Sequence, residues 1–310
     1  MLARQAIAYS SPAPVLTRVM LYQICHQTTY SYSQPVLLKP HTLNLRPQSN
    51  SWQHVRSCSI QVSPSPESRS DYADLDGNSP TKLWFDRPTQ TLSVQATSIV
   101  ETLQSNPFLF LLEPWAIALP FDYPQSLQSR LSSYLQPLTP SIHPAVVELA
   151  HTLLHKVDAK PLDFLNTLNQ HINQSCRYIH RATGRPWSAG MTWAQKQGSC
   201  RDLCVLFMEV CRQVGLATRF ASGYQEGDPG AANDLHAWVE VYLPGAGWRG
   251  YDPTLGLAVS DRHITISASA HPHDAAPIVG TFTPVNPVES RTSPPTSTLE
   301  TQILLQQLSQ

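Results

Sequence analysis

The sequence predicts an α+β fold in which a strand-rich N-terminal region precedes a core of helices and strands. Between Leu21 and Glu101, apolar and polar residues alternate, and β-branched and aromatic side chains are common, as in half-buried strands. Between Pro144 and Val214, apolar residues instead recur at helical spacing. After Gly215 the strand-like pattern returns in short runs. We therefore expect helices packed on an antiparallel sheet, preceded by a separate β-domain.

The N-terminal region, residues 21–101, is expected to form a small, mostly antiparallel β-domain. Its strand-like runs are separated by turn signals such as Ser63-Pro64-Ser65-Pro66 and Asp76-Gly77-Asn78. The expected strands are Leu21–Tyr30, Thr42–Arg46, Val55–Val62, Thr81–Phe85 and Thr91–Val100.

The core is expected over residues 145–283, after a proline-rich connector with short helical pieces at residues 102–144. Helices are predicted to begin at Pro144, at about Pro161 and at Cys200, the last ending near Val214 because Gly215 is a favourable residue after a helix C-terminus. The expected strands of the core are Ala217–Gln225, Ala237–Leu243, Trp248–Tyr251 and His263–Ser267, with a Gly/Ala/Asn loop at Asp228–Asn233.

Both ends of the chain are expected to lie outside the packed structure. Residues 1–20 resemble a disordered leader without the apolar stretch of a secretory signal, so translation could begin at Met1 or Met20. Residues 284–310 are rich in proline, serine and threonine and predict a flexible tail. Within that tail, Leu299–Leu308 has the composition of a short helix.

Composition excludes several classes of function. The chain has 310 residues, of which 14% are charged, with a formal net charge of −1, so it lacks the basic face of a nucleic-acid-binding protein. Scattered lysines and arginines and short apolar runs argue against a membrane partner or a transmembrane protein. The six cysteines do not indicate a disulfide framework in a chain of this length, so a cytoplasmic location is expected.

Three residues together predict nucleophilic catalysis: Cys200, His236 and Asp252. Cys200 begins an amphipathic helix, and the positive end of a helix dipole favours a thiolate. His236 begins one strand and Asp252 ends the next, with the turn Pro244–Gly247 between them. Antiparallel pairing places the start of one strand beside the end of the other, so the carboxylate can orient the imidazole toward the thiol.

The surroundings of Cys200 suggest how a developing oxyanion would be stabilised. The backbone N–H of Cys200 is a natural donor at the free end of its helix. A second donor is expected from upstream, with Trp193, Gln195 and Gln197 as candidates, and Asp202 is expected to hydrogen-bond the first turn of the helix. Trp187, Trp193, Trp238 and Trp248 are candidates for walls of the cleft.

Each residue also has a plainer explanation. A buried cysteine is usually a small apolar side chain, which suits Cys204 and Cys211, and an aspartate before proline often only ends a strand. The combination and order of Cys200, His236 and Asp252 favour catalysis over three separate structural roles. The cysteines do not have zinc-site spacing, and no glycine-rich nucleotide motif is present, so no metal or cofactor is expected.

The chain resembles bacterial transglutaminase-like proteins, which are often described as candidate cysteine proteases. Four segments in order carry the resemblance of the core: Gly198-Ser199-Cys200-Arg201-Asp202, Arg219–Tyr224, His236–Tyr242 and Gly247–Thr254. In the N-terminal region the matching segments are Tyr22–Tyr32, Leu45-Arg46-Pro47 and Asp76-Gly77-Asn78. The resemblance extends from about Leu21 to Phe282 and departs from the family pattern around Ser269–Pro272.

This resemblance implies a papain-like core in which Cys200 is the nucleophile, His236 the base and Asp252 the residue that orients it. The implied activity is cysteine-dependent acyl transfer on a peptide or protein substrate, with hydrolysis of a peptide or isopeptide bond favoured. Transfer to an amine, as in a transglutaminase, uses the same thioester intermediate and stays open. A catalytically idle module that only binds a peptide is the alternative from another class, and the oligomeric state stays open.

Overall fold

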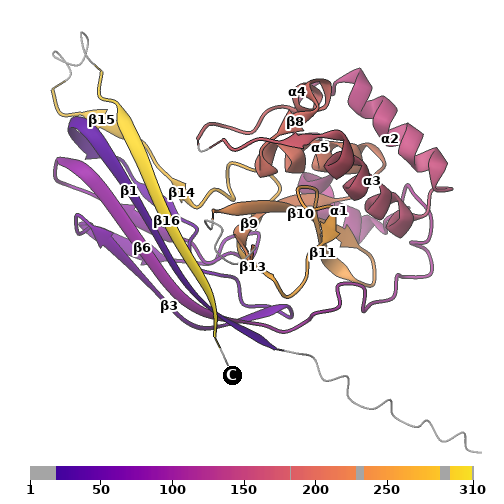
Figure 1. Cartoon of the computed structure of the whole chain (residues 1–310), viewed down its shortest axis with the longest axis horizontal. Helices are drawn as coiled ribbons and strands as arrows, with labels where there is room; N and C mark the ends of the chain where they lie inside the picture. Colours follow the sequence, from indigo (N-terminus) through magenta and orange to yellow (C-terminus); the bar gives the residue numbers. More distant parts are fainter. Residues whose placement is uncertain (1–18, 182, 228–233, 287–293, 309–310) are drawn as a thin grey trace, which may run out of the picture.

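The computed structural model describes residues 19–181, 183–227, 234–286 and 294–308. Figure 1 shows two adjoining parts: a long curved sheet, and a second sheet covered by helices. The predicted leader falls almost entirely on residues 1–18, and the predicted loop on 228–233; both lie outside the described residues.

The long sheet is built on two extended strands, β1 (Met20–Leu38) and β6 (Thr89–Thr102), which pair antiparallel. In both strands every second residue is buried over most of the length, as the alternating sequence predicts. β3 (Gln53–Ser63) extends the sheet beyond β6. The shorter strands β2 (His41–Leu43), β4 (Ser68–Asp71) and β5 (Thr81–Trp84) form part of a second, four-stranded sheet.

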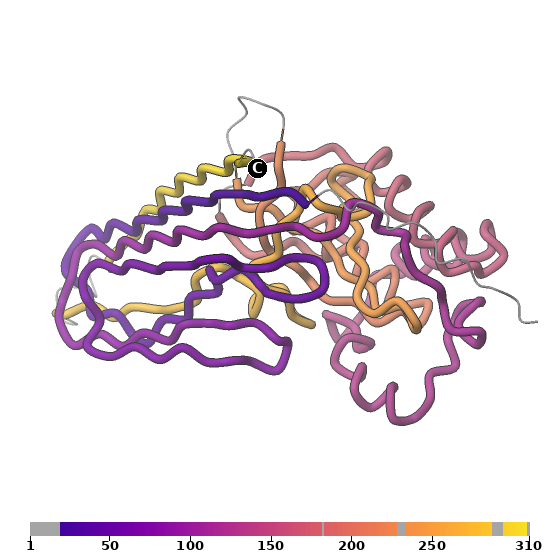
Figure 2. The backbone as a smooth tube through the Cα atoms, turned by 90° about the horizontal axis from the view of Figure 1, so that it is seen from below, coloured from indigo at the N-terminus to yellow at the C-terminus, as the bar shows by residue number. Residues whose placement is uncertain are grey.

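The C-terminal segment completes the N-terminal β-domain, which corrects the prediction of a flexible tail. β16 (Ser297–Leu308) pairs antiparallel with β1 over twelve residues, and Figure 2 shows these first and last strands side by side. β15 (Phe282–Pro284) also pairs with β1, and β14 (Ile278–Val279) pairs with β2. The leucine- and glutamine-rich segment Leu299–Leu308 is therefore a strand and not a helix, because pairing with the free edge of β1 overrides its local helix propensity.

The helices α2 (Pro144–Lys156), α3 (Pro161–Ser175), α4 (Ala189–Gln195) and α5 (Cys200–Gln213) lie together on one side of the core sheet (Figure 1). The first helix, α1 (Gln125–Leu135), carries Tyr134, whose ring packs against the ring of Trp248. The predicted helix starts at Pro144, Pro161 and Cys200 are correct. The helix α5 is central, since its residues from Asp202 to Arg212 are all buried. Within the described residues, no helix is long and apolar enough to cross a bilayer.

The sheet of the core has the strand order β12-β11-β10-β9-β13. Its strands are β9 (Thr218–Gln225), β10 (His236–Leu243), β11 (Gly247–Asp252), β12 (Leu257–Ala258) and β13 (His263–Ser269). All its described neighbouring strands pair antiparallel, as predicted. Two short strands, β7 (Arg177–Tyr178) and β8 (Gln197–Gly198), pair parallel just before α5.

The two parts share a packed boundary formed by β9 and β13. Tyr224, Ile264 and Ile266 of the core belong to the apolar cluster of the N-terminal β-domain. Buried polar groups reinforce this contact. Gln53 of β3 bonds both the N–H and the C=O of Thr265, and Asn78 does the same for Ala268.

Candidate active site

Cys200 begins α5, where the local sequence determines the shape of the chain. Ser199 and Asp202 form a capping box, in which the Ser199 backbone N–H donates to Asp202 Oδ2 at 2.8 Å. Gly198 is required just before it, because a Cβ there would lie 2.8 Å from the Asp202 Cβ. The sequence Gly-Ser-Cys therefore brings the chain tightly into the helix and places Cys200 at its exposed start.

Asp202 also attaches a neighbouring loop to the start of α5. Its fully buried carboxylate accepts two 2.6 Å hydrogen bonds from Arg181 Nη1 and one of 2.7 Å from the Trp187 backbone N–H. Burial acts to raise the pKa of Asp202, but these donors and the bonds from Ser199 lower it below its usual value. Asp202 thus fixes the loop that runs past Cys200.

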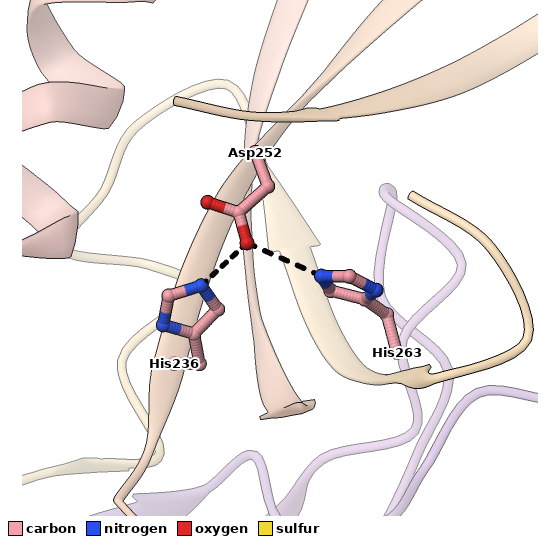
Figure 3. A group of neighbouring side chains, drawn as sticks. All are labelled: His236, Asp252 and His263. Atoms are coloured by element: carbon pink, nitrogen blue, oxygen red, sulfur yellow. Dashed lines mark hydrogen bonds and ion pairs between the residues drawn. The ribbon is translucent and has the colours of Figure 1, made fainter. Parts of the chain in front are cut away.

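The β10–β11 hairpin brings His236 and Asp252 together, as the sequence predicts. The two strands pair antiparallel, so the start of β10 lies beside the end of β11. The distance from His236 Nε2 to Asp252 Oδ2 is 2.7 Å, and Figure 3 shows the two side chains facing each other. The His236 side chain is 13% exposed and Asp252 is fully buried, so only the imidazole meets solvent.

Asp252 is held by donors on both of its carboxylate oxygens. Oδ1 accepts hydrogen bonds from the backbone N–H groups of Thr254 and Leu255 at 2.9 and 3.2 Å. Oδ2 accepts from His236 and also from His263 Nε2 at 3.2 Å (Figure 3). Burial acts to raise the pKa of Asp252, but these histidine partners lower it well below its usual range. The carboxylate is therefore ionised at neutral pH.

The same contacts favour the imidazolium form of His236. Burial acts to lower its pKa, but the hydrogen bonds with Asp252 and with the Cys200 thiol, and the negative charges of both groups, raise it to about 10. Because Nε2 is directed to Asp252, Nδ1 is the ring nitrogen left for Cys200. Cys204 and Cys211 differ sharply, since burial raises the pKa of each thiol well above its usual value.

His263 also belongs to this cluster, a place that its local sequence does not predict. It was expected only as the first residue of a strand, and nothing in its spacing separates it from the other eleven histidines of the chain. The antiparallel pairing of β13 with β9 places His263 beside Asp252. Only this non-local pairing could have revealed it.

Cys200 and His236 both line a cleft with a volume of about 780 Å³. This volume is within the range typical of ligand-binding pockets. The lining also includes Trp187, Arg201, Phe220 and Pro277. Its walls are mostly apolar, with basic and polar side chains interspersed.

Several residues predicted near the cleft are placed elsewhere. Trp193, Gln195 and Gln197, the candidates for a second oxyanion donor, are not among the residues that line it. The Trp193 ring packs against His171, and the Gln197 amide oxygen accepts from Arg177. Of the four tryptophans expected as walls, Trp187 lines the cleft, whereas Trp238 is fully buried and Trp248 lines a separate cavity.

His236, Asp252 and His263 could also be considered as metal ligands, because their donor atoms all lie within 4.8 Å of one another. Two ligands bound to one zinc ion at the tetrahedral angle lie about 3.3 Å apart. The 2.7 Å between His236 Nε2 and Asp252 Oδ2 is shorter than this and matches a charge-assisted hydrogen bond. The geometry fits a hydrogen-bonded network better than a metal site.

A solved structure has a fold similar to that of this chain over nearly its whole length. The crystal structure of a candidate cysteine protease from Cytophaga hutchinsonii superposes with a TM-score of 0.70 at 21% identity, covering 95% of this chain and 92% of that one. At this identity the likeness shows a shared fold. An uncharacterized protein of Mycobacterium tuberculosis is 28% identical over 289 residues, which are 88% of this chain and 91% of that protein.

A shorter match concerns the core alone. A protein-glutamine gamma-glutamyltransferase of Pseudomonas aeruginosa is 29% identical over 116 residues, which are 34% of this chain and 17% of that protein. Residues 22–101 match the family model of the bacterial transglutaminase-like N-terminal region, and residues 149–253 match that of the transglutaminase-like superfamily. These matches support a cysteine-dependent enzyme in general. Residues 22–101 thus match the N-terminal region of bacterial transglutaminase-like proteins, and residues 149–253 match a core of the transglutaminase-like superfamily.

Proposed function

We propose that this protein hydrolyses a peptide or isopeptide bond through a thioester on Cys200. The observation that carries the proposal is that Cys200 and His236 line one cleft while His236 is hydrogen-bonded to the buried Asp252. A thiol at the start of a helix, beside an imidazolium held by a carboxylate, is the arrangement that activates a cysteine nucleophile. The substrate in this proposal is a peptide or a protein.

In the first step, the Cys200 thiolate attacks the carbonyl carbon of the amide and forms a C–S bond. The carbonyl oxygen becomes an oxyanion, which the backbone N–H of Cys200 can stabilise at the start of α5. The tetrahedral intermediate then collapses, the C–N bond breaks, and the His236 imidazolium gives its proton to the leaving amine. A thioester and a neutral imidazole remain.

In the second step, neutral His236 removes a proton from a water molecule, whose oxygen attacks the thioester carbon. The C–S bond breaks, and the Cys200 thiolate and His236 imidazolium are restored. A primary amine in place of water would give a new amide, which is the transglutaminase outcome. The volume of the cleft, about 780 Å³, supports access of water to the thioester.

The direct test is to incubate the protein with a peptide library and a labelled primary amine and to analyse the products by mass spectrometry. Cys200→Ala is the inactive variant, and Cys58→Ala, which removes a thiol from the N-terminal β-domain, is the matched control. We expect shortened peptides from the wild type and from Cys58→Ala, and none from Cys200→Ala.

Two results would contradict this proposal in different ways. Peptides carrying the amine label, without shortened products, would mean transfer to amines instead of hydrolysis. Shortened peptides from Cys200→Ala at the wild-type rate would mean that Cys200 is not the nucleophile.

A further inference from the structure

We propose that His263 is a positioning residue for Asp252, and that the N-terminal β-domain supports it in this role. In this arrangement His263 holds the carboxylate so that the carboxylate can orient His236 toward Cys200. The inference rests on the function proposed above, and it assigns a role to a residue outside the expected triad.

The first observation is how the donors divide over Asp252. Two backbone N–H groups hold Oδ1, whereas Oδ2 has only the imidazoles of His236 and His263, at 2.7 and 3.2 Å (Figure 3). Without His263, the described residues would leave Oδ2 with a hydrogen bond from His236 alone, the residue that exchanges protons in the proposed reaction. A second donor limits rotation of the carboxylate about its Cβ–Cγ bond.

The second observation is that His263 is itself held firmly. It is 7% exposed, and its ring meets the fully buried Trp238 ring edge to face, with centroids 5.2 Å apart. Gly223 allows this packing, because a Cβ at that position would lie 2.6 Å from the Trp238 ring and 2.0 Å from the Ile264 carbonyl oxygen. A ring fixed by packing can direct its donor without losing conformational entropy.

The tautomer of His263 follows from its partners. A carboxylate only accepts hydrogen bonds, so the ring proton lies on Nε2, which faces Asp252. Nδ1 is buried and has no hydrogen-bond partner among the described residues. A proton on Nδ1 would be a buried donor without an acceptor, so the contacts favour Nε2 as the nitrogen that donates. His263 therefore donates to Asp252 through Nε2.

The third observation links His263 to the N-terminal β-domain. Two residues after His263, Thr265 receives a hydrogen bond at its C=O from Gln53 Nε2 and gives one from its N–H to Gln53 Oε1, both 2.8 Å long. Gln53 belongs to β3 and is 2% exposed. The N-terminal β-domain thereby fixes the strand that presents His263.

The test measures the reactivity of Cys200 beside His236, and it does not need the natural substrate. The rate of Cys200 alkylation by iodoacetamide is measured against pH by peptide mass spectrometry, in the wild type and in His263→Leu and His263→Gln. The ionisable groups around the Cys200–His236 pair are Arg201, Asp202 and Cys204 on α5, Tyr178 on β7, Asp252 on β11 and His263 on β13. His26→Leu, which removes an equally buried histidine outside the site, is the matched control.

We expect His263→Leu to slow the alkylation of Cys200 at pH 6 by about tenfold, as is typical when a supporting partner is lost. The alkaline limb of the profile should move to lower pH, because a less ordered carboxylate stabilises the imidazolium less well. His263→Gln, whose amide can still donate to Asp252, should stay within about twofold of wild type. His26→Leu should leave the profile unchanged, and melting temperatures report whether each variant is folded.

The outcomes separate this inference from the proposed function. A folded His263→Leu with the wild-type profile would overturn the positioning role, and so would an alkaline limb that moves to higher pH. If the wild-type Cys200 itself reacts no faster than Cys58, the proposed function fails instead. Should His263→Leu not fold, the failure of a folded His263→Gln to retain the wild-type profile would overturn the inference.

Discussion

The Nε2 atom of His236 lies 2.7 Å from the Oδ2 atom of Asp252, across a hairpin whose turn is only Pro244-Gly245-Ala246. This short connection makes the relationship a local one, because two adjacent strands place both residues. Cys200 lines the same cleft from the start of α5, which precedes the hairpin in the sequence and is separated from it by β9. The site therefore depends on how α5 packs against β10.

The protonation of His236 should make a pH-dependent contribution to stability. Its pKa rises from the ordinary 6.5 to about 10 in the folded protein. Because the folded value is higher, the contribution is complete below pH 6.5 and is lost as the pH rises toward about 10. Denaturant unfolding of wild type and His236→Gln at pH 6, 8 and 10 measures it. The difference in unfolding free energy should shrink with rising pH, and a difference that grows would contradict the sign.

The buried Asp202 should contribute more to the free energy of unfolding than an ordinary carboxylate in the first turn of a helix. Asp202→Asn removes the buried carboxylate charge that pairs with Arg181 Nη1, and breaking a buried ion pair costs about 3 kcal/mol. Asp163, an acidic residue in the first turn of α3, is the matched control, and Asp163→Asn should cost less than about 1 kcal/mol. Denaturant midpoints provide the comparison, and equal losses in the two variants would show that the Arg181 pair contributes little.

The C-terminal strand should stabilise the N-terminal β-domain through one face only. Ile303 is 6% exposed and packs into the apolar cluster of that domain, whereas the adjacent Leu304 is 70% exposed. We expect Ile303→Ala to lower the free energy of unfolding by about 2 kcal/mol and Leu304→Ala to change it by less than about 0.5 kcal/mol. Thermal or denaturant unfolding tests this pair. Similar effects at both positions would argue against the strand pairing of β16.

Contact between the N-terminal β-domain and β13 should affect the reactivity of Cys200. Gln53→Leu removes both hydrogen bonds to Thr265 and leaves the Thr265 backbone groups facing an apolar side chain. We expect slower alkylation of Cys200 in this variant. Gln61→Leu is the control, since Gln61 is exposed on the same strand. An unchanged alkylation rate in a folded Gln53→Leu would mean that this contact only holds the two parts together.

Local patterns in the sequence predict much of this fold, and most of the errors fall where distant segments pair. The long alternating runs indicated β1, β3 and β6, and proline marked the starts of α2 and α3 correctly. β16 was missed because leucine and glutamine favour a helix, and only the free edge of β1 makes the segment a strand. The short strand β14 was missed for the same reason, since it exists only by pairing with β2.

In the candidate site too, the residues placed by local structure could be predicted, and the residue placed by pairing of distant segments could not. His236 and Asp252 could be predicted together because one hairpin joins them, and Cys200 because Gly198 and Ser199 mark the start of a helix. His263 could not be predicted, since its place beside Asp252 depends on β13 pairing with β9. The second oxyanion donor, with Trp193, Gln195 and Gln197 as candidates, stays a prediction; the Trp193 ring packs against His171.

The most direct test of the account measures how fast iodoacetamide alkylates each cysteine at pH 6, by peptide mass spectrometry. We predict that Cys200 reacts far faster than Cys58, because the His236 imidazolium stabilises its thiolate. Cys204 and Cys211 should not react while the protein is folded, since they are buried and their thiol pKa values are raised. His236→Ala and Asp252→Asn should each slow Cys200 while leaving Cys58 unchanged. If Cys200 reacts like Cys58 in the wild type and neither substitution alters its rate, the proposed activated cysteine does not exist.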